Sequence, residues 1–266
     1  LDRYPLAEIP LPASYNDSMA DKPNLYRRMR DQVFGQLGPE EVRDTIRHYW
    51  AYCSWLDHLF GQLLDQLEAS GQAENTLIVY CADHGDYAGE HGLFAKGIPN
   101  FDGAYHVPAV VRYPAAIQQP GRQVAGLVSL CDFGPTFLEA AGLPVPATSH
   151  GRSLWPWLRG ESPADWRQGL LRVCDGVENY VTQRSIVTAD WHYTYNPFDF
   201  DELYDLRHDP AEMRNLARDP AYAEQVRTLC AAMWRLAAEV DDVPGNAYIT
   251  TALAPIGPLA AVKTGA

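Results

Sequence analysis

Residues 77–108 read LIVYCADHGDYAGEHGLFAKGIPNFDGAYHVP, and they indicate both the class of fold and the position of a functional site. Residues 76–82 are an unbroken run of apolar and β-forming residues, typical of a strand buried on both faces in a parallel sheet. The run ends at Asp83-His84-Gly85, two side chains able to bind metal and a residue free to turn. Ligands of open α/β sheets lie past the carboxyl ends of the strands. The stretch therefore predicts a functional site just after residue 82, with Lys96 in the glycine-rich loop that follows.

The flanking segments predict an α/β region up to about residue 150. Apolar residues recur at three- and four-residue steps from 42 to 67, which indicates a long helix beginning near Pro39. Residues 107–113 and 124–130 are apolar runs that predict two further strands. Asp132 is expected to cap a helix over residues 133–141. The proline-rich residues 1–38 predict an extended surface segment with a short helix near 25–34.

A smaller α+β subdomain is expected over residues 151–240. Four short β-forming pieces separated by turns predict antiparallel strands, and an amphipathic helix follows over residues 221–240. The strand pieces are residues 170–174, 184–188, 192–195 and 202–206. Residues 241–266 are rich in Pro, Gly and Ala, which predicts a tail or an arm onto a neighbouring copy. The expected domains are thus 1–150, 151–240 and 241–266, and a homo-oligomer is one alternative.

Composition limits the classes of partner. The formal net charge is −13, which argues against nucleic acid and anionic membranes, because both require clustered Lys and Arg. No apolar run approaches the ~20 residues that span a bilayer. The 5 cysteines are an odd number without a CxxC pair, which favours free thiols over disulfides. This usage favours a cytoplasmic location over a periplasmic or secreted one.

Four blocks of sequence, in order, resemble the sulfatase family of the alkaline phosphatase superfamily. They are ADHGDYAGEHGLFAKG with HVPAVVRYP, VSLCDFGPTFLEAAGLPVP, HGRSLWPWLRG, and ELYDLRHDPAEMRNLARDP. The resemblance extends to about residue 240. It implies an α/β fold with an alkaline-phosphatase-like, mainly parallel sheet flanked by helices, of which this chain is the second half. The smaller C-terminal α+β subdomain with antiparallel strands follows it.

The resemblance also implies site residues. Asp83 and His84 fall on the pair that binds one divalent cation in the family, with Ca²⁺ as first choice and Mg²⁺ or Mn²⁺ as alternatives. Lys96 falls on the family lysine that contacts the sulfuryl and leaving oxygens, and is the expected catalytic residue. His91 is a candidate substrate contact, although a hydrogen bond that stabilises the loop is the favoured interpretation. His106 stands where many relatives have Arg, and is a second candidate substrate contact.

Sulfatases attack their substrate with formylglycine, made from a Cys or Ser in a motif such as C-x-P-S-R. None of the five cysteines here stands in such a motif, since they are followed by SWLD, ADHG, DFGP, DGVE and AAMW. The Asp pair of metal ligands from the first half of the family's fold is absent as well. We expect this chain to be the second half of a sulfatase-like protein and inactive alone. The N-terminal half of the same protein, with its formylglycine, is the expected partner.

Three functions remain open at this point. The first is a sulfuric ester hydrolase of the arylsulfatase kind, acting on a small-molecule sulfate ester. The second is a phosphonate monoester or phosphodiester hydrolase of the same superfamily. The third is a non-catalytic fragment or pseudoenzyme subunit. The intact set of Asp83, His84 and Lys96 argues against the third, because a pseudoenzyme has no need of all three.

Overall fold

A computed structural model describes residues 1–176, 181–242 and 251–263. The chain forms two compact units, each assembled from segments distant in the sequence. Unit 1 consists of Leu1–Ile9, Arg43–Asp83 and Val107–Arg167, and unit 2 of Pro10–Val42, His84–His106 and Gln168–Ala266. The predicted domain boundaries at 150 and 240 stay a prediction. Of the expected arm over 241–266, residues 243–250 and 264–266 lie outside the described residues.

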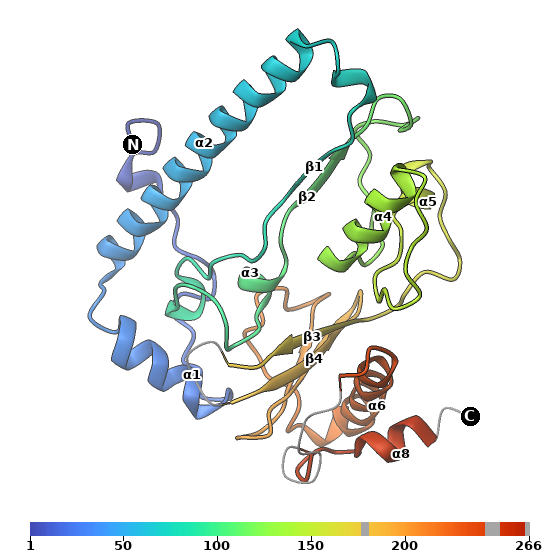
Figure 1. Ribbon diagram of the computed structural model, residues 1–266. Coiled ribbons are helices and arrows are strands. Elements are labelled where there is room, and N and C mark those ends of the chain that lie inside the picture. The colour runs from blue at the N-terminus through green and yellow to red at the C-terminus, as the bar shows by residue number, and fades with distance from the viewer. Residues whose placement is uncertain (177–180, 243–250, 264–266) are drawn as a thin grey trace. The chain divides into compact units, whose positions relative to one another are not determined.

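The long helix α2, Pro39–Ala69, belongs to unit 1 from Arg43 onward (Figure 1). It begins at the proline, and Glu40 and Glu41 complement the positive end of the helix dipole. Its apolar stripe is only partly covered: the ring of Phe60 lies 5.2 Å from that of Tyr80, whereas Tyr52 and Trp55 are exposed. The predicted helix is therefore confirmed, but much of its aromatic surface faces solvent in this chain.

Strands β1, Ile78–Cys81, and β2, Ala109–Arg112, form a two-stranded antiparallel sheet in unit 1 (Figure 1). The prediction that β1 is buried on both faces is wrong for this chain. Tyr80 on β1 and Val110 on β2 are 40% and 60% exposed. An unbroken apolar run indicates a buried environment, but among the described residues β2 is the only strand that pairs with β1. Both faces of β1 are consequently left partly exposed, although its apolar side chains are of the kind found in buried strands.

The rest of unit 1 packs around helix α4, Phe133–Ala140, and the short helix α5, Trp155–Leu158. The strand predicted over residues 124–130 does not form. Its backbone bonds elsewhere: the carbonyl of Leu127 accepts the indole N–H of Trp166 at 2.8 Å. Gly126 lies so close to Trp157 that an added Cβ would come within 2.6 Å of that ring. Side-chain packing thus takes the place of a neighbouring strand.

Asp132 precedes α4 as predicted, but its side chain does not cap that helix. The buried carboxylate accepts the backbone N–H groups of Ser129 and Arg152, each at 2.8 Å. It also accepts two hydrogen bonds from the Arg167 guanidinium, at 2.5 and 2.7 Å. This planar, bidentate pair is a stronger use of a buried carboxylate than a cap, because it neutralises the charge as well as satisfying the oxygens.

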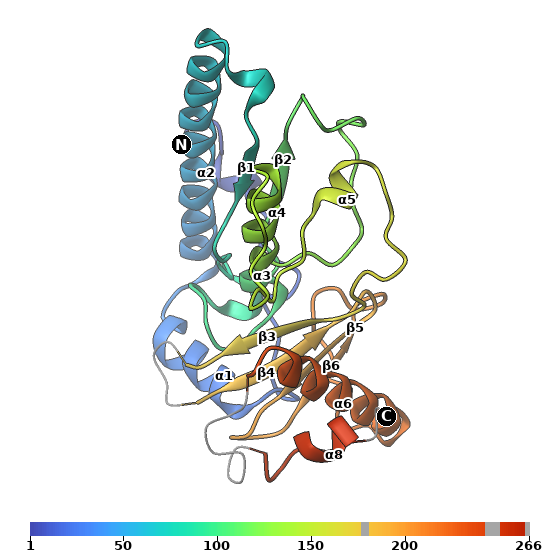
Figure 2. The ribbon, with the colours of Figure 1, turned by 45° about the vertical axis from the view of Figure 1, so that its right-hand side comes forward.

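Unit 2 contains a four-stranded antiparallel sheet in the order β3-β4-β5-β6, as the short β-forming pieces predicted (Figure 2). Its strands are Leu170–Cys174, Gln183–Val187, Trp191–Tyr195 and Glu202–Asp205. Helix α6, Ala223–Glu239, packs on one face of this sheet. The α+β class expected for this region is confirmed.

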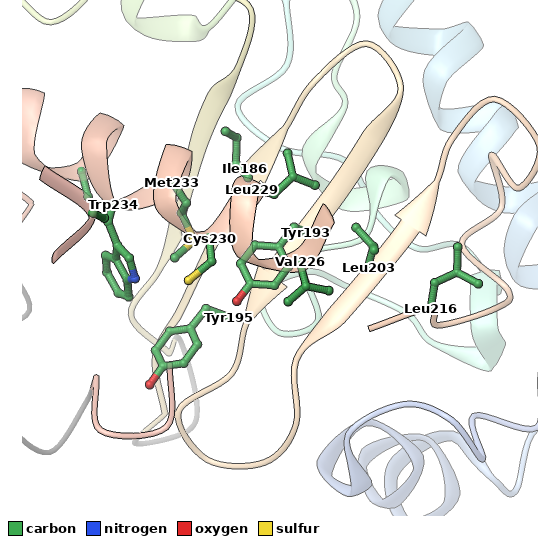
Figure 3. Close-up of a cluster of buried hydrophobic side chains, with 12 residues drawn as sticks. Ile186, Tyr193, Tyr195, Leu203, Leu216, Val226, Leu229, Cys230, Met233 and Trp234 are labelled. Carbon is green, nitrogen blue, oxygen red and sulfur yellow. The ribbon is translucent and has the colours of Figure 1, made fainter. Parts of the chain in front are cut away.

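The face of the sheet toward α6 is apolar (Figure 3). Alternate strand residues, Tyr193, Tyr195 and Leu203 among them, meet Met233 and Trp234 of the helix. Helix α8, Pro258–Lys263, contributes Ala261 to the same cluster. These buried aromatic and sulfur side chains form the largest apolar core of the unit.

The opposite face of the same sheet is polar, and it is buried too. His192, Thr194 and Ser185 are less than 2% exposed. The side chains of Ser185 and Thr194 bond to Asn100, whereas His192 bonds to Glu212, whose other carboxylate oxygen accepts the backbone N–H of Asp102. Helices α1, Asn24–Met29, and α3, Asp102–Tyr105, also belong to this side of unit 2, together with a turn of π-helix over Arg30–Phe34. Within the described parts of the chain, no helix is both long and apolar enough to cross a membrane.

Candidate active site

The predicted metal-binding pair lies directly after strand β1. The strand ends at Cys81, and the side chains of Asp83 and His84 are both exposed. Asp83 is the last residue of its segment of unit 1, and His84 opens the next segment of unit 2. The sequence thus places a carboxylate and an imidazole at adjacent positions beyond a strand end, as the fold class requires of a site.

The backbone after His84 is fixed by a close approach. The N–H of Gly85 donates to the carbonyl of Ala104 at 2.8 Å. A Cβ on Gly85 would lie 2.1 Å from the carbonyl oxygen of Gly103, so only glycine fits there. A Cβ on Gly103 would in turn come within 2.0 Å of a carboxylate oxygen of Glu90. The start of the loop is therefore held against α3 by a backbone contact at Gly85 that tolerates no side chain, whereas Gly103 meets only the flexible end of the Glu90 side chain.

The ring of His84 is oriented by its neighbour. Its Nδ1 lies 2.8 Å from the carbonyl oxygen of Gly85, which only accepts hydrogen bonds. Nδ1 therefore carries the proton, and Nε2 carries the lone pair that a metal ion needs. This tautomer, on the residue that follows Asp83 in the sequence, is one that could contribute a nitrogen ligand to a divalent-cation site. Across the described residues, no group of three or more His, Cys, Asp or Glu side chains could hold a metal.

Lys96 is exposed on a loop that is closed by hydrogen bonds. The carboxylate of Asp86 accepts the N–H groups of Ala88 at 2.8 Å and Ala95 at 3.2 Å, which closes the loop on itself. The carbonyl of Gly97, next to the lysine, accepts the hydroxyl of Tyr105 at 3.1 Å. Ala88 and Ala95 both have left-handed backbone angles, with φ of 46° and 66°. Such conformations cost energy in residues other than glycine and persist only when the surroundings impose them.

His91, a candidate substrate contact, is buried and 1% exposed. Its Nδ1 lies 2.8 Å from Oδ2 of Asp17, and its ring stacks on Phe101 with centroids 4.2 Å apart. This geometry favours the loop-stabilising hydrogen bond over a contact with substrate. The adjacent Glu90 is half-buried, and burial raises the pKa of its carboxyl group, to which the nearby Glu212 carboxylate adds.

His106, the other candidate substrate contact, follows α3 directly and is exposed. Its Nδ1 lies 3.7 Å from Oδ2 of Asp102. The other oxygen of Asp102 accepts from Arg172 at 2.6 Å. Burial alone would raise the pKa of Asp102, but the guanidinium and the nearby histidines hold it below its ordinary value. A role for His106 toward substrate stays a prediction.

Sequence reasoning did not find the residues that hold this loop in place. They are Asp17, Lys22, Asn100, Arg172, His192 and Glu212. Each bonds to a partner that is distant in the sequence or lies in a buried network. Asn100 lies in the stretch 77–108 and Glu212 in ELYDLRHDPAEMRNLARDP, but neither sequence carried a signal for these contacts.

Comparison with known proteins agrees with these features. Residues 10–143 match the family model described as "Sulfatase", and residues 89–239 match the one described as "N-sulphoglucosamine sulphohydrolase, C-terminal". The chain is 36% identical over 196 residues to N-acetylglucosamine-6-O-sulfatase of Bacteroides thetaiotaomicron, covering 71% of this chain and 35% of that protein. It is 33% identical to choline-sulfatase of Rhizobium meliloti, covering 72% and 37%.

A solved structure extends the likeness to the fold. Phosphonate monoester hydrolase from Silicibacter pomeroyi superposes with a TM-score of 0.78 and 27% identity, covering 88% of this chain and 51% of that one. The chain therefore belongs to the sulfatase family, and its alkaline-phosphatase-like α/β class is confirmed. It spans between about a third and a half of the length of these relatives.

Proposed function

We propose that the protein containing this chain hydrolyses sulfate esters with the help of one divalent cation. The observation that carries the proposal is the presence of Asp83 and His84 directly after strand β1, and of Lys96 on a hydrogen-bonded loop, in a chain of the sulfatase family. A sulfate ester is already anionic, so hydrolysis requires neutralising charge and a strong nucleophile. The side chains of Asp83, His84 and Lys96 are suited to neutralising the charge, directly or through a bound cation.

Asp83 and His84 would hold the cation, through a carboxylate oxygen and the Nε2 lone pair. When bound, a divalent cation supplies neutralisation of the ester's charge and activation of the nucleophile. We propose Ca²⁺ as the ion, with Mg²⁺ or Mn²⁺ as alternatives. Two donors do not complete a coordination sphere, so the remaining ligands would come from outside these two residues.

Lys96 would place its ammonium group on the sulfuryl and leaving oxygens. Negative charge develops on the leaving oxygen as the ester bond breaks, and a fixed cationic donor stabilises that charge. The exposed position of Lys96 leaves its side chain accessible to a substrate, while the hydrogen bonds of Asp86 and Tyr105 limit movement of the backbone beneath it.

The nucleophile would be a formylglycine supplied by the N-terminal half of the same protein. None of the cysteines in residues 1–266 stands in a C-x-P-S-R motif, and Cys174 and Cys230 are buried. On this proposal the chain contributes part of the metal site and the leaving-group lysine, and lacks activity alone. The substrate is a small-molecule ester. A cytoplasmic location and a homo-oligomer remain further proposals.

A phosphonate monoester hydrolase is the second candidate, favoured by the structural likeness to the enzyme from Silicibacter pomeroyi. The two functions are separated by assaying the complete protein on 4-nitrophenyl sulfate and on a 4-nitrophenyl phosphonate monoester, because the leaving group is then identical. We expect the larger kcat/KM for the sulfate. A larger value for the phosphonate would select the second candidate, and no hydrolysis of either ester by metal-loaded protein would favour a non-catalytic role.

A further inference from the structure

We propose that Asp17 and Glu212 are positioning residues for Lys96. Each is a buried carboxylate whose hydrogen bond holds one end of the loop that carries Lys96, and each of these two contacts is called a pin below. The inference rests on the proposed function, since it assigns these residues a role in the same reaction. The segment between the two pinned positions runs from residue 91 to residue 102 and contains the lysine. Neither carboxylate is near enough to Lys96 in sequence to be part of its motif.

The first pin joins the N-terminal part of unit 2 to His91. This histidine has left-handed backbone angles, with φ of 51°, which its surroundings must impose. Asp17 holds its Nδ1 at 2.8 Å, and the hydroxyl of Ser14 accepts its backbone N–H at 3.1 Å. The stacked ring of Phe101 closes the other side. Side chain and backbone of His91 are therefore fixed together.

Asp17 is kept ionised by a buried lysine. The Nζ atom of Lys22 lies 2.8 Å from Oδ2 of Asp17, and the side chain of Lys22 has no exposed surface. Lys22 also donates to the carbonyl of Met213 at 2.8 Å. Burial would raise the pKa of Asp17, but the hydrogen bonds from His91 and Lys22 hold it well below its ordinary value. The buried carboxylate of Asp17 is held in one geometry, because losing either His91 or Lys22 as a partner would leave a buried charge uncompensated and lower the stability of the fold.

The second pin joins the C-terminal part of unit 2 to the start of α3. Glu212 is 2% exposed, and its Oε2 accepts the backbone N–H of Asp102 at 2.9 Å. Its other oxygen lies 2.5 Å from Nδ1 of the buried His192. Glu212 itself has a left-handed φ of 53°. A strained residue is thus held where its carboxylate reaches the loop.

The polar face of the sheet supports this second pin. Asn100 donates to the hydroxyl of Ser185 at 2.9 Å and accepts from Thr194 at 3.0 Å. Arg172 bonds to the carbonyl of Asn100 and to the carboxylate of Asp102. Three strands of the sheet therefore bond to the two residues that flank Phe101.

Between the pins, the loop is anchored by apolar side chains and exposed at the lysine. Leu93, Ile98 and Phe101 are each no more than 3% exposed, whereas Ala95 and Lys96 are exposed. An apolar anchor fills space without fixing orientation as hydrogen bonds do. Because a misplacement of about 1 Å can cost a hundredfold in rate, the two carboxylates have a functional reason to fix both ends.

The test uses Asp17→Asn and Glu212→Gln in the complete, metal-loaded protein. Each change keeps the side-chain volume and removes the charge. We expect kcat on the sulfate ester to fall roughly ten- to a hundredfold, with KM within about threefold and metal content unchanged. The control is Asp201→Asn, because the carboxyl group of Asp201 is partly buried and hydrogen-bonded as well, but its partners are Tyr193 and Asn196. The control should leave kcat unchanged.

A double-mutant cycle separates positioning from general structural damage. In the Lys96→Ala background, Asp17→Asn should lower kcat by less than about twofold further, because the group that it positions is gone. An equal loss in both backgrounds would overturn the proposal. So would wild-type kcat in both single variants.

A second readout is independent of activity, so it also distinguishes failure of this inference from failure of the proposed function. Trypsin cleaves after exposed lysines, and cleavage after Lys96 requires the loop to open. We expect both carboxylate variants to be cut there at least about tenfold faster than wild type, and Asp201→Asn at the wild-type rate. Unchanged cleavage in both carboxylate variants would overturn the pinning itself, whatever ester the protein hydrolyses.

Discussion

The sheet β3-β4-β5-β6 and the strand pair β1–β2 differ in how far their side chains are buried. All five residues of β4 are buried, whereas β1 has no buried residue and Val110 of β2 is 60% exposed. The four-stranded sheet has an apolar face on α6 and a polar face bonded to the loop of Lys96. Sheets with two covered faces are stable units, whereas an isolated strand pair is marginal.

The two sheets therefore differ in how well they support the candidate site residues next to them. Unit 2 holds the loop of Lys96 with its own sheet, its own core and two buried carboxylates. Asp83, by contrast, follows a strand with one neighbour among the described residues. Metal binding by Asp83 is therefore expected to depend on protein segments outside residues 1–266. The placement of Lys96 is not expected to depend on them.

The largest effect expected on stability is in the core of unit 2. Trp234 is 1% exposed, packs on Tyr195 and donates its indole N–H to the carbonyl of Ile256 at 3.0 Å. Trp234→Ala should lower the free energy of unfolding by about 3–5 kcal/mol, through lost contacts and the cavity left behind. Urea denaturation measures it. A loss below about 1 kcal/mol would contradict the description of this cluster as the core.

Lys96→Ala should affect turnover and not stability. Removing one charge-stabilising donor typically costs a hundredfold or more in kcat. Because the side chain of Lys96 is exposed, the free energy of unfolding should change by less than about 0.5 kcal/mol. Steady-state kinetics and urea denaturation of the complete protein give both numbers. Near-normal turnover would make Lys96 an ordinary surface lysine.

The polar edge of the core predicts a dependence of stability on pH. Burial raises the pKa of Asp201 to about 6 from its ordinary 3.8, although Tyr193 donates to it at 2.6 Å. Between these values the native state binds more protons than the unfolded state, so stability falls as pH rises. The contribution is present below about pH 4 and lost above about pH 6, and it amounts to about 3 kcal/mol at most. Asp201→Asn should flatten this part of the curve, and an unchanged slope would contradict the assignment.

The smallest effect is expected on the exposed face of α2. Trp55 is 53% exposed and packs on Tyr52 with ring centroids 5.6 Å apart. In the chain of residues 1–266, Trp55→Ala should change the free energy of unfolding by less than about 0.5 kcal/mol. Trp234→Ala is the matched comparison. A loss of several kcal/mol from Trp55→Ala would show that this face is covered in the folded chain.

The sequence predicted the regular elements where local pattern and packing agree. The strands of unit 2 and helix α6 fall within two residues of their expected positions, because alternation and three- to four-residue steps report burial directly. The run over residues 124–130 failed because its backbone bonds to a tryptophan side chain instead of a strand. A short apolar run indicates that its side chains are buried, but it does not show that its backbone pairs with another strand.

Motif and spacing indicated Asp83, His84 and Lys96, but not what supports them. The partners of His91 and Asp102 lie 74 and 110 residues away in the sequence. Buried polar pairing of this kind has no period and no local composition, so only the folded chain reveals it. The same holds for Asp132, whose place before α4 suggested a cap, while its carboxylate binds Arg167.

Asp83 and His84 are proposed to bind a divalent cation, and the metal content of the purified protein tests this binding. We expect the complete wild-type protein, purified and dialysed against Ca²⁺, to retain about one ion per chain by elemental analysis, and Asp83→Ala to retain none. Asp65→Ala is the control, because it removes an exposed carboxylate from helix α2. Equal metal content in wild type and Asp83→Ala would show that Asp83 is not a metal ligand.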